Sequence, residues 1–192
     1  YADRRMFLDA QPTLNERLGR SALIAHETSH MWFGDYVTMA WFNDVWTKEV
    51  FANYFASRIV EPQYPAVNHR LNFIRDYLPS AYSEDRTLGA NSIQQSLDNL
   101  RNAGLVYGAI IYNKSPIVME MLVRVLGEEA FREGIQEYIK SFPYGNATWD
   151  ELIEILDHYT DVDLRSWSQA WVGAKGMPEL TATIEGDELV VR

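Results

Sequence analysis

The sequence predicts a mainly α-helical protein, and three features of its 192 residues support this. Most of the chain divides into segments of helical length that carry apolar side chains on one face. Several of these segments begin or end at residues that favour helix initiation or termination. Apolar and polar residues alternate as they do in β-strands only near the C-terminus. Hydrophobic residues make up 47% of the chain, so the helices have enough apolar surface to form a core.

The first two helices have recognisable boundaries. The first is expected over residues 14–33, with Gly34 as the residue that ends it. A short connection leads to the second, which is expected over residues 44–60. Asp44 suits the N-cap of this helix, and Pro62 lies just beyond its end.

Residues 61–100 are interrupted by prolines and by Gly89, and they show less regular periodicity. We expect short helices at residues 68–77 and 93–100. After them, Ser115-Pro116 is a typical helix start, because serine suits an N-cap and proline suits the first helical position. The sequence therefore predicts a helix over residues 116–126, ended by Gly127.

The remaining helices lie in the last third of the chain. One is expected over residues 128–141, which are rich in good helix formers. The next begins at a capping box formed by Thr148 and Glu151 and extends to about residue 159. The last is expected over residues 164–172.

From Leu180 onward, alternating residues predict a β-hairpin whose turn is Gly186-Asp187. We therefore expect residues 1–178 to form a helical domain and residues 179–192 to begin a following β module. The first residue is not a methionine, so we expect the chain to be an internal piece of a longer protein.

Composition excludes some classes of function. The formal net charge of −10 disfavours binding to nucleic acid and to anionic membrane surfaces. No apolar run is long enough to span a membrane and no signal peptide opens the chain, so this segment predicts no membrane contact. A cytoplasmic and a cell-envelope location both stay open. Because the chain has no cysteine, any metal site must use histidine and carboxylate ligands.

The pentapeptide His26-Glu27-Thr28-Ser29-His30 carries two of the four histidines. Histidines four positions apart lie one turn apart on the same face of a helix, so His26 and His30 can bind one Zn²⁺. Glu27 flanks this face and can reach a water at the metal, which suits a general base. The alternative is a pair of core or surface histidines that happen to fall four positions apart.

A catalytic zinc needs a third protein ligand and an open position. Glu49 is the best candidate, and 18 residues lie between it and His30. The same face of its helix carries Ala52 and Ala56, whose small side chains would allow a close approach to the first helix. The alternative is a helix carboxylate that pairs with Lys48.

Metal-bound histidines usually donate their second ring N–H to an outer acceptor. Asn53, one turn after Glu49, and Asp35, just after the first helix, are the candidates for this role. The alternative is an ordinary polar contact for Asn53 and a loop carboxylate for Asp35.

These residues resemble a known family. Residues 23–35 (Leu-Ile-Ala-His-Glu-Thr-Ser-His-Met-Trp-Phe-Gly-Asp) are similar to the zinc helix of the aminopeptidase N (membrane alanyl aminopeptidase) family of gluzincins. That family has His-Glu-x-x-His, 18 residues and then Glu, and Glu49 fits this pattern. Residues 49–52 resemble its Glu-Gly-Phe-Ala segment. The resemblance extends from about Ser21 to Pro178.

A second block, Tyr112-Asn113-Lys114-Ser115, resembles the family's Tyr-x-Lys-Gly segment. The resemblance implies that Tyr112 donates a hydrogen bond to the oxyanion of the tetrahedral intermediate. Without the resemblance, a tyrosine just before a helix in an aromatic-rich chain is more often a packing residue.

Some residues depart from the family pattern. Lys48 replaces the usual asparagine, and Val50 and Ser115 replace glycines. These changes concern the shape of substrate subsites more than catalysis. The family's Gly-x-Met-Glu-Asn motif, whose glutamate recognises the substrate's amino terminus, is absent from these residues.

The resemblance implies the helical lobe of a thermolysin-like metallopeptidase catalytic domain, with one Zn²⁺ per chain. It implies peptide substrates and release of their N-terminal amino acids, with upstream β domains of the parent chain needed to complete the site. One alternative is an endopeptidase with the same zinc chemistry. The other is a catalytically silent scaffold that keeps the fold in order to bind partners.

Overall fold

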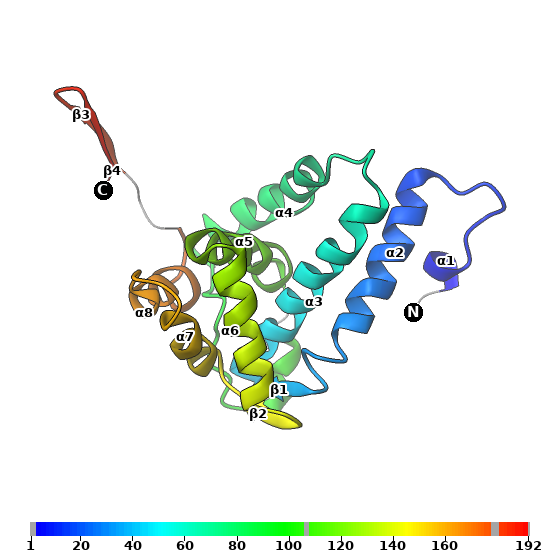
Figure 1. Cartoon of the computed structure of the whole chain (residues 1–192), viewed down its shortest axis with the longest axis horizontal. Helices are drawn as coiled ribbons and strands as arrows, with labels where there is room; N and C mark the ends of the chain where they lie inside the picture. Colours follow the sequence, from blue (N-terminus) through cyan, green and yellow to red (C-terminus); the bar gives the residue numbers. More distant parts are fainter. Residues whose placement is uncertain (1–2, 106–107, 178–180, 192) are drawn as a thin grey trace.

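The computed structural model describes residues 3–105, 108–177 and 181–191, and helices form most of it. Figure 1 shows α2 (Leu14–Ser29) and α3 (Val45–Val60) side by side, with α5 (Ser115–Leu126) and α6 (Glu128–Ser141) beyond α3. The mainly α-helical fold class predicted from the sequence is confirmed.

The first long helix, α2, starts where the sequence predicts. Thr13 and Glu16 form a capping box, which satisfies backbone N–H groups at the start of the helix. A short helix, α1 (Asp3–Met6), precedes it. The expected end at residue 33 was wrong, because α2 ends at Ser29 and residues 30–33 form a tighter turn. Gly34 closes that turn with a φ of +130°, a conformation that favours glycine.

A short parallel ladder joins two distant parts of the chain. β1 (Val37–Met39) pairs with β2 (Gly145–Ala147), with Thr38 opposite Asn146. Three-residue strands are too short for alternation to be recognised, so the sequence did not predict them. The 3₁₀ turn η1 (Phe42–Asp44) then leads from β1 into α3.

Asp44, expected to cap α3, has a different role. Its side chain makes no capping bond within the described residues. Instead, its buried carboxylate accepts hydrogen bonds from Nε2 of Gln94 at 2.7 Å and from the backbone N–H of Trp149 at 3.2 Å. Burial raises the pKa of this carboxyl. Asp44 therefore occupies the predicted N-cap position, but the predicted capping bond was wrong, because distant partners use the side chain.

The helix expected at residues 68–77 is longer in the structure. The 3₁₀ turn η2 (Glu61–Gln63) is followed by α4 (His69–Asp85), and the side chain of Asn68 caps α4. Pro79 lies inside α4 and costs it one backbone hydrogen bond. The helix continues past the proline because Ala81 and Asp85 are buried against the rest of the fold.

The helix expected at residues 93–100 was wrong. Residues 91–99 are all described and contain no helix, and the 3₁₀ segment η3 (Leu100–Leu105) follows them. The backbone N–H groups of Ile93 and Gln94 both donate to the carbonyl of Val172, at 3.1 and 3.2 Å. The Ile93 side chain is fully buried. These long-range contacts hold the segment in an irregular conformation.

The next helix begins earlier than expected. η4 (Ile110–Lys114) is a π-helical turn that runs directly into α5. Ser115, expected as the N-cap, lies inside this continuous helix, and its hydroxyl donates to the carbonyl of Ile111. The N-cap prediction was therefore wrong, whereas the expected end at Gly127 is confirmed by a φ of +82° there. α6 has the expected bounds.

The last helices follow the predicted order. α7 (Trp149–Asp157) ends two residues before the expected position. The single helix expected at 164–172 consists of α8 (Leu164–Ser168) and the π-helical turn η5 (Gln169–Gly173).

The predicted hairpin is present as β3 (Ala182–Glu185) and β4 (Glu188–Val191), paired antiparallel with Ile184 opposite Leu189. Gly186 provides the turn with a φ of +69°. Residues 178–180 lie outside the described residues, so a domain boundary at 178 stays a prediction.

The main core joins α3, α5 and α7. The rings of Trp46 and Trp149 lie 4.6 Å apart, and both side chains are buried. Leu122 of α5 and Leu156 of α7 are fully buried in the same cluster. These contacts hold α3 in place from the side opposite α2, and thereby fix the position of the residues that α3 presents to α2.

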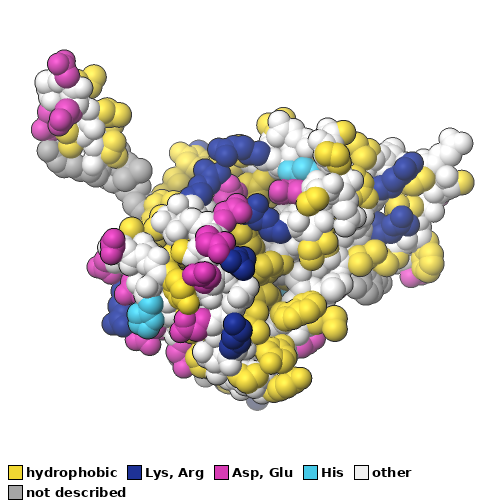
Figure 2. All heavy atoms as spheres, in the orientation of Figure 1, with side chains coloured by type: hydrophobic (Ala, Val, Ile, Leu, Met, Phe, Trp, Pro, Cys, Tyr) yellow, Lys and Arg dark blue, Asp and Glu magenta, His cyan; other side chains and the backbone are white. Residues whose placement is uncertain are grey.

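The surface reflects the acidic composition. Figure 2 shows acidic side chains gathered over α6, α7 and α8 on the visible face. The acidic residues in the sequence of α6 are Glu128, Glu129, Glu133 and Glu137, and those in α7 are Asp150, Glu151, Glu154 and Asp157. In the described part of the chain, no helix has both the length and the apolar character needed to cross a membrane.

Thr148→Ala is expected to lower the free energy of unfolding by about 1 kcal/mol, within a range of about 0.5–2 kcal/mol. The Thr148 hydroxyl accepts from the backbone N–H of Glu151, and the Glu151 carboxylate accepts from the backbone N–H of Thr148. Alanine removes the first of these bonds. Urea unfolding monitored by circular dichroism would measure the change. Thr148→Ser keeps the hydroxyl and is expected to match the parent, and a loss as large as that of alanine would contradict the capping role.

Candidate metal centre

Two neighbouring helices bring His26, His30 and Glu49 together. Nε2 of His26 lies 3.2 Å from Nε2 of His30. Oε2 of Glu49 lies 3.6 Å from Nε2 of His26 and 3.9 Å from Nε2 of His30. His26 in the last turn of α2, His30 at the C-cap of α2 and Glu49 on α3 thus direct three potential ligand atoms at one point.

Small side chains allow this convergence. Ala25 of α2 and Ala56 of α3 are buried together in a small cluster with Val60. Ala52, one turn before Ala56, is fully buried. Because these side chains are short, the two helices approach closely enough for the Glu49 carboxylate to reach both imidazoles.

Each imidazole has a second partner that fixes its orientation. Nδ1 of His26 lies 2.9 Å from Oδ1 of Asn53, and Nδ1 of His30 lies 3.0 Å from the carbonyl oxygen of Phe33. Amide and carbonyl oxygens only accept hydrogen bonds, so both Nδ1 atoms are the donors. With Nδ1 as the donor, the neutral form of each ring has its lone pair on Nε2, which faces Glu49.

Of the two residues expected to accept a hydrogen bond from a histidine ring, Asn53 contacts one and Asp35 does not have this role. Asn53 lies where it can orient His26. Asp35 is exposed, and its backbone N–H donates to the carbonyl of His30 at 3.0 Å. The acceptor at the His30 ring is the Phe33 carbonyl, which sequence reasoning missed. A backbone carbonyl leaves no residue-type signal, and its direction depends on the turn that Gly34 closes.

The electrostatics of the cluster favour a cation. Two Nε2 lone pairs and one carboxylate oxygen are all hydrogen-bond acceptors, so they repel one another unless a positive charge lies among them. The Glu49 carboxylate raises the pKa of His26 above its ordinary value, despite partial burial of the ring. Burial acts to raise the pKa of Glu49, but His26 and the charge of Lys48 outweigh it and leave this pKa lowered.

The two oxygens of Glu49 have different neighbours. Oε2 faces the two histidines, whereas Oε1 lies 3.6 Å from Nζ of Lys48. Pairing with Lys48, the alternative considered from the sequence, is therefore present together with the histidine cluster. One carboxylate serves both contacts.

The three residues fit a divalent metal with tetrahedral geometry. Ligand atoms about 2.0–2.1 Å from a tetrahedral zinc lie about 3.3 Å from one another. The separations of 3.2, 3.6 and 3.9 Å are close to this value. Two imidazoles and one carboxylate also match the ligand types of a three-ligand catalytic zinc site.

The two residues expected to be catalytic, Glu27 and Tyr112, lie on different elements. Glu27 is exposed on α2, next to His26 in the sequence. Tyr112 lies in the π-helical turn η4, which packs against α3, and it is 41% exposed. Sequence reasoning gave no indication of a π-helical turn at this position.

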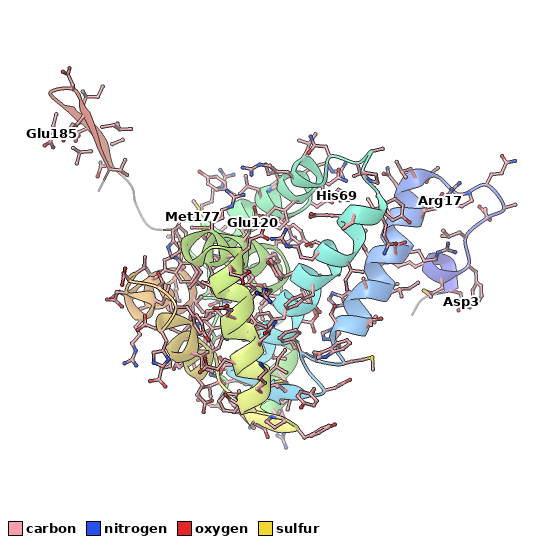
Figure 3. All side chains as sticks on the ribbon, in the orientation of Figure 1. Asp3, Arg17, His69, Glu120, Met177 and Glu185 are labelled. Atoms are coloured by element: carbon pink, nitrogen blue, oxygen red, sulfur yellow. The ribbon has the colours of Figure 1, made fainter. Side chains whose placement is uncertain are left out.

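The two remaining histidines lie outside the cluster. His69, labelled in Figure 3, begins α4, and its Nε2 donates to the carbonyl of Tyr64 at 2.9 Å. His158 is exposed at the end of α7. Among the described residues, the one group that brings three metal-ligating side chains together is the cluster of His26, His30 and Glu49.

The chain is similar to several known proteins. It is 29% identical over 189 residues to the probable aminopeptidase 1 of Sulfurisphaera tokodaii. This alignment covers 98% of this chain and 24% of that protein. It is 35% identical over 170 residues to the aminopeptidase N of Streptomyces lividans, covering 88% of this chain and 20% of that protein. It is 32% identical over 193 residues to the aminopeptidase N of Lactococcus lactis subsp. cremoris, covering 100% of this chain and 23% of that protein.

The chain thus spans about a fifth to a quarter of the length of these relatives. The sequence pattern of the peptidase family M1 domain matches residues 1–171, which is most of the chain. With the match over this length and the identities to aminopeptidases, the resemblance to the aminopeptidase N family is confirmed. The chain belongs to peptidase family M1.

Proposed function

We propose that this chain carries the zinc-binding part of an aminopeptidase that releases N-terminal amino acids from peptides. The observation that carries the proposal is the convergence of Nε2 of His26, Nε2 of His30 and Oε2 of Glu49. All three atoms are acceptors, and their second partners hold them in place without using the atoms that face one another.

In the proposed site, His26, His30 and Glu49 hold one Zn²⁺. When bound, zinc supplies Lewis-acid chemistry that polarises the scissile carbonyl and favours loss of a proton from water. Glu27 accepts that proton as water attacks the peptide carbonyl, and then donates it to the leaving amine. Its exposure supports this role, because a base must be accessible to substrate.

Tyr112 is proposed to donate its phenolic hydrogen to the oxygen of the peptide carbonyl as negative charge develops there. Its partial exposure and the packing of η4 against α3, which carries Glu49, support this assignment. A neutral donor that is already oriented stabilises the developing charge without reorganisation during the reaction.

The choice of aminopeptidase over endopeptidase rests on the relatives. The proteins from Streptomyces lividans and Lactococcus lactis are both named aminopeptidase N. The cluster itself would serve either reaction, because it acts on the peptide bond and not on the amino terminus.

Hydrolysis of two matched substrates by the full-length gene product tests the proposal. One substrate is an alanyl anilide with a free amino group, and the other is the same compound N-acetylated. We expect cleavage of the free-amine compound alone. Equal cleavage of both would keep the zinc chemistry and reject the exopeptidase function. Cleavage of neither, together with a zinc content near zero, would favour a silent scaffold.

Asn53→Ala is expected to weaken zinc binding by about 10- to 100-fold, because His26 loses the partner that orients its ring. Competition with a chromophoric chelator would measure the change. Ser57→Ala, one turn further along α3, is the control, since the Ser57 hydroxyl donates to the carbonyl of Tyr54 within the same helix. Equal zinc affinity of the Asn53 variant and the control would contradict the orienting role of Asn53.

A further inference from the structure

A buried lysine lies two residues after Tyr112. Nζ of Lys114 lies 2.9 Å from Oδ1 of Asp85 and 2.7 Å from the carbonyl oxygen of Gly176. The side chains of Lys114 and Asp85 are 5% and 2% exposed. The lysine therefore ties η4 to the end of α4 and to the segment that follows η5.

Gly176, whose carbonyl accepts from Lys114, has a backbone conformation that favours glycine. Gly176 has a φ of +73°, and a Cβ atom added there would lie 3.7 Å from the backbone oxygen of Asp85. Met177, labelled in Figure 3, is the next residue, and η5 just before this segment contacts α5. The carbonyl that accepts from Lys114 is thus presented by a defined turn.

The π-helical turn that carries Tyr112 could form at a neighbouring position in the same helix. Ile110–Lys114 form a π-helical turn, which contains one residue more than an α-helical turn. If this extra residue moved along the helix, the residues it passed would rotate by about 100° around the axis. A shift of this kind would change the direction of the Tyr112 side chain without breaking the helix.

Lys114 and Tyr112 lie on opposite sides of the turn. Residues two positions apart in a helix differ by about 200° in direction. Their exposure agrees with this, because Lys114 is buried and Tyr112 is 41% exposed. A constraint on where Lys114 points is therefore also a constraint on where Tyr112 points.

The buried ion pair of Lys114 and Asp85 is not explained by its contribution to the free energy of folding. Removing two charges from water costs about as much as their attraction returns, and apolar replacements are often equally stable. The best-attested benefit of such a pair is to fix one register among several. In the π-helical turn of residues 110–114, the register determines the direction of the Tyr112 side chain, and therefore its proposed role in the reaction.

We propose that Lys114 is a positioning residue that fixes the register of the π-helical turn, and thereby the direction of Tyr112, through its contacts with Asp85 and the Gly176 carbonyl. This inference rests on the proposed function, in which Tyr112 donates to the developing oxyanion. Lys114 itself takes no part in the chemistry.

The test replaces both charges in the full-length gene product, as Lys114→Met with Asp85→Leu. Changing both avoids leaving one buried charge unpaired. We expect the parent's fold and zinc content, an unchanged KM and a kcat lowered by about 10- to 100-fold. In a Tyr112→Phe background, the same pair of changes is expected to lower kcat no further. Glu129→Gln with Arg132→Gln, which removes an exposed pair on α6, is the control and should leave kcat unchanged.

A readout without activity separates this inference from the proposed function. With fluorotyrosine incorporated, the ¹⁹F signal of Tyr112 is identified by its loss in Tyr112→Phe. We expect that signal to shift or split when Lys114 and Asp85 are replaced, and to stay unchanged in the control. An unchanged signal, or an equal further loss of kcat in the Tyr112→Phe background, would overturn the positioning role. Absence of peptidase activity in the parent would overturn the proposed function, and the ¹⁹F signal would still decide the role of Lys114.

Discussion

Glu27→Gln is expected to keep zinc bound and to lower kcat by about 100- to 10,000-fold. Glutamine has nearly the same shape as glutamate, but its amide does not accept the proton that leaves the attacking water. Zinc binding is expected to stay intact, because Glu27 is exposed and lies outside the cluster of His26, His30 and Glu49. Steady-state kinetics on a free-amine peptide substrate and zinc analysis of the same sample measure both effects.

Glu84→Gln is a matched control for this substitution. Glu84 is an exposed carboxylate near the end of α4, and its loss is expected to leave kcat unchanged. Turnover of Glu27→Gln at the parent rate would exclude Glu27 as the base. A loss of zinc in Glu27→Gln would instead show that this residue supports the metal.

Glu49→Ala is expected to lower zinc affinity by more than about 100-fold. This loss is larger than the usual loss when a residue that only hydrogen-bonds to a metal ligand is removed. The substitution removes the carboxylate oxygen that faces both imidazoles, and two histidines alone make a weak site. Equilibrium dialysis followed by metal analysis would measure the affinity, and hydrolysis should be lost in parallel.

Lys48→Ala distinguishes the two contacts that Glu49 makes. Lys48 lies beside Oε1, whereas the histidines face Oε2. If Glu49 is a zinc ligand, Lys48→Ala is expected to retain zinc and Glu49→Ala to lose it. If Glu49 serves only as a partner of Lys48, both variants should retain zinc, and that result would refute the ligand assignment.

The cluster was predictable because its geometry is mostly local. The spacing of His26 and His30 fixes their common face, and the expected helix boundaries placed Glu49 within a turn of Ala52 and Asn53. The capping box of Thr148 and Glu151 likewise marked a helix start at the correct position. In each of these cases, residues within a few turns of one another determine the structure.

What the sequence did not predict depends on contacts between distant residues. Asp44 suits a helix cap in isolation, but Gln94 and Trp149 use its carboxylate. Pro79 suggests an interruption, but burial of the residues after it keeps α4 continuous. The π-helical turn before Ser115 has no residue-type signal, because the extra residue is accommodated by tertiary packing and not by a preferred amino acid.

The bond between Asp44 and Trp149 has a consequence for the order of folding. It joins residues 105 positions apart, whereas only 18 residues lie between His30 and Glu49. Short loops close at a lower entropic cost and faster than long ones. The pair of helices that carries His30 and Glu49 can therefore assemble as a local unit before the distant contact with Trp149 closes the domain.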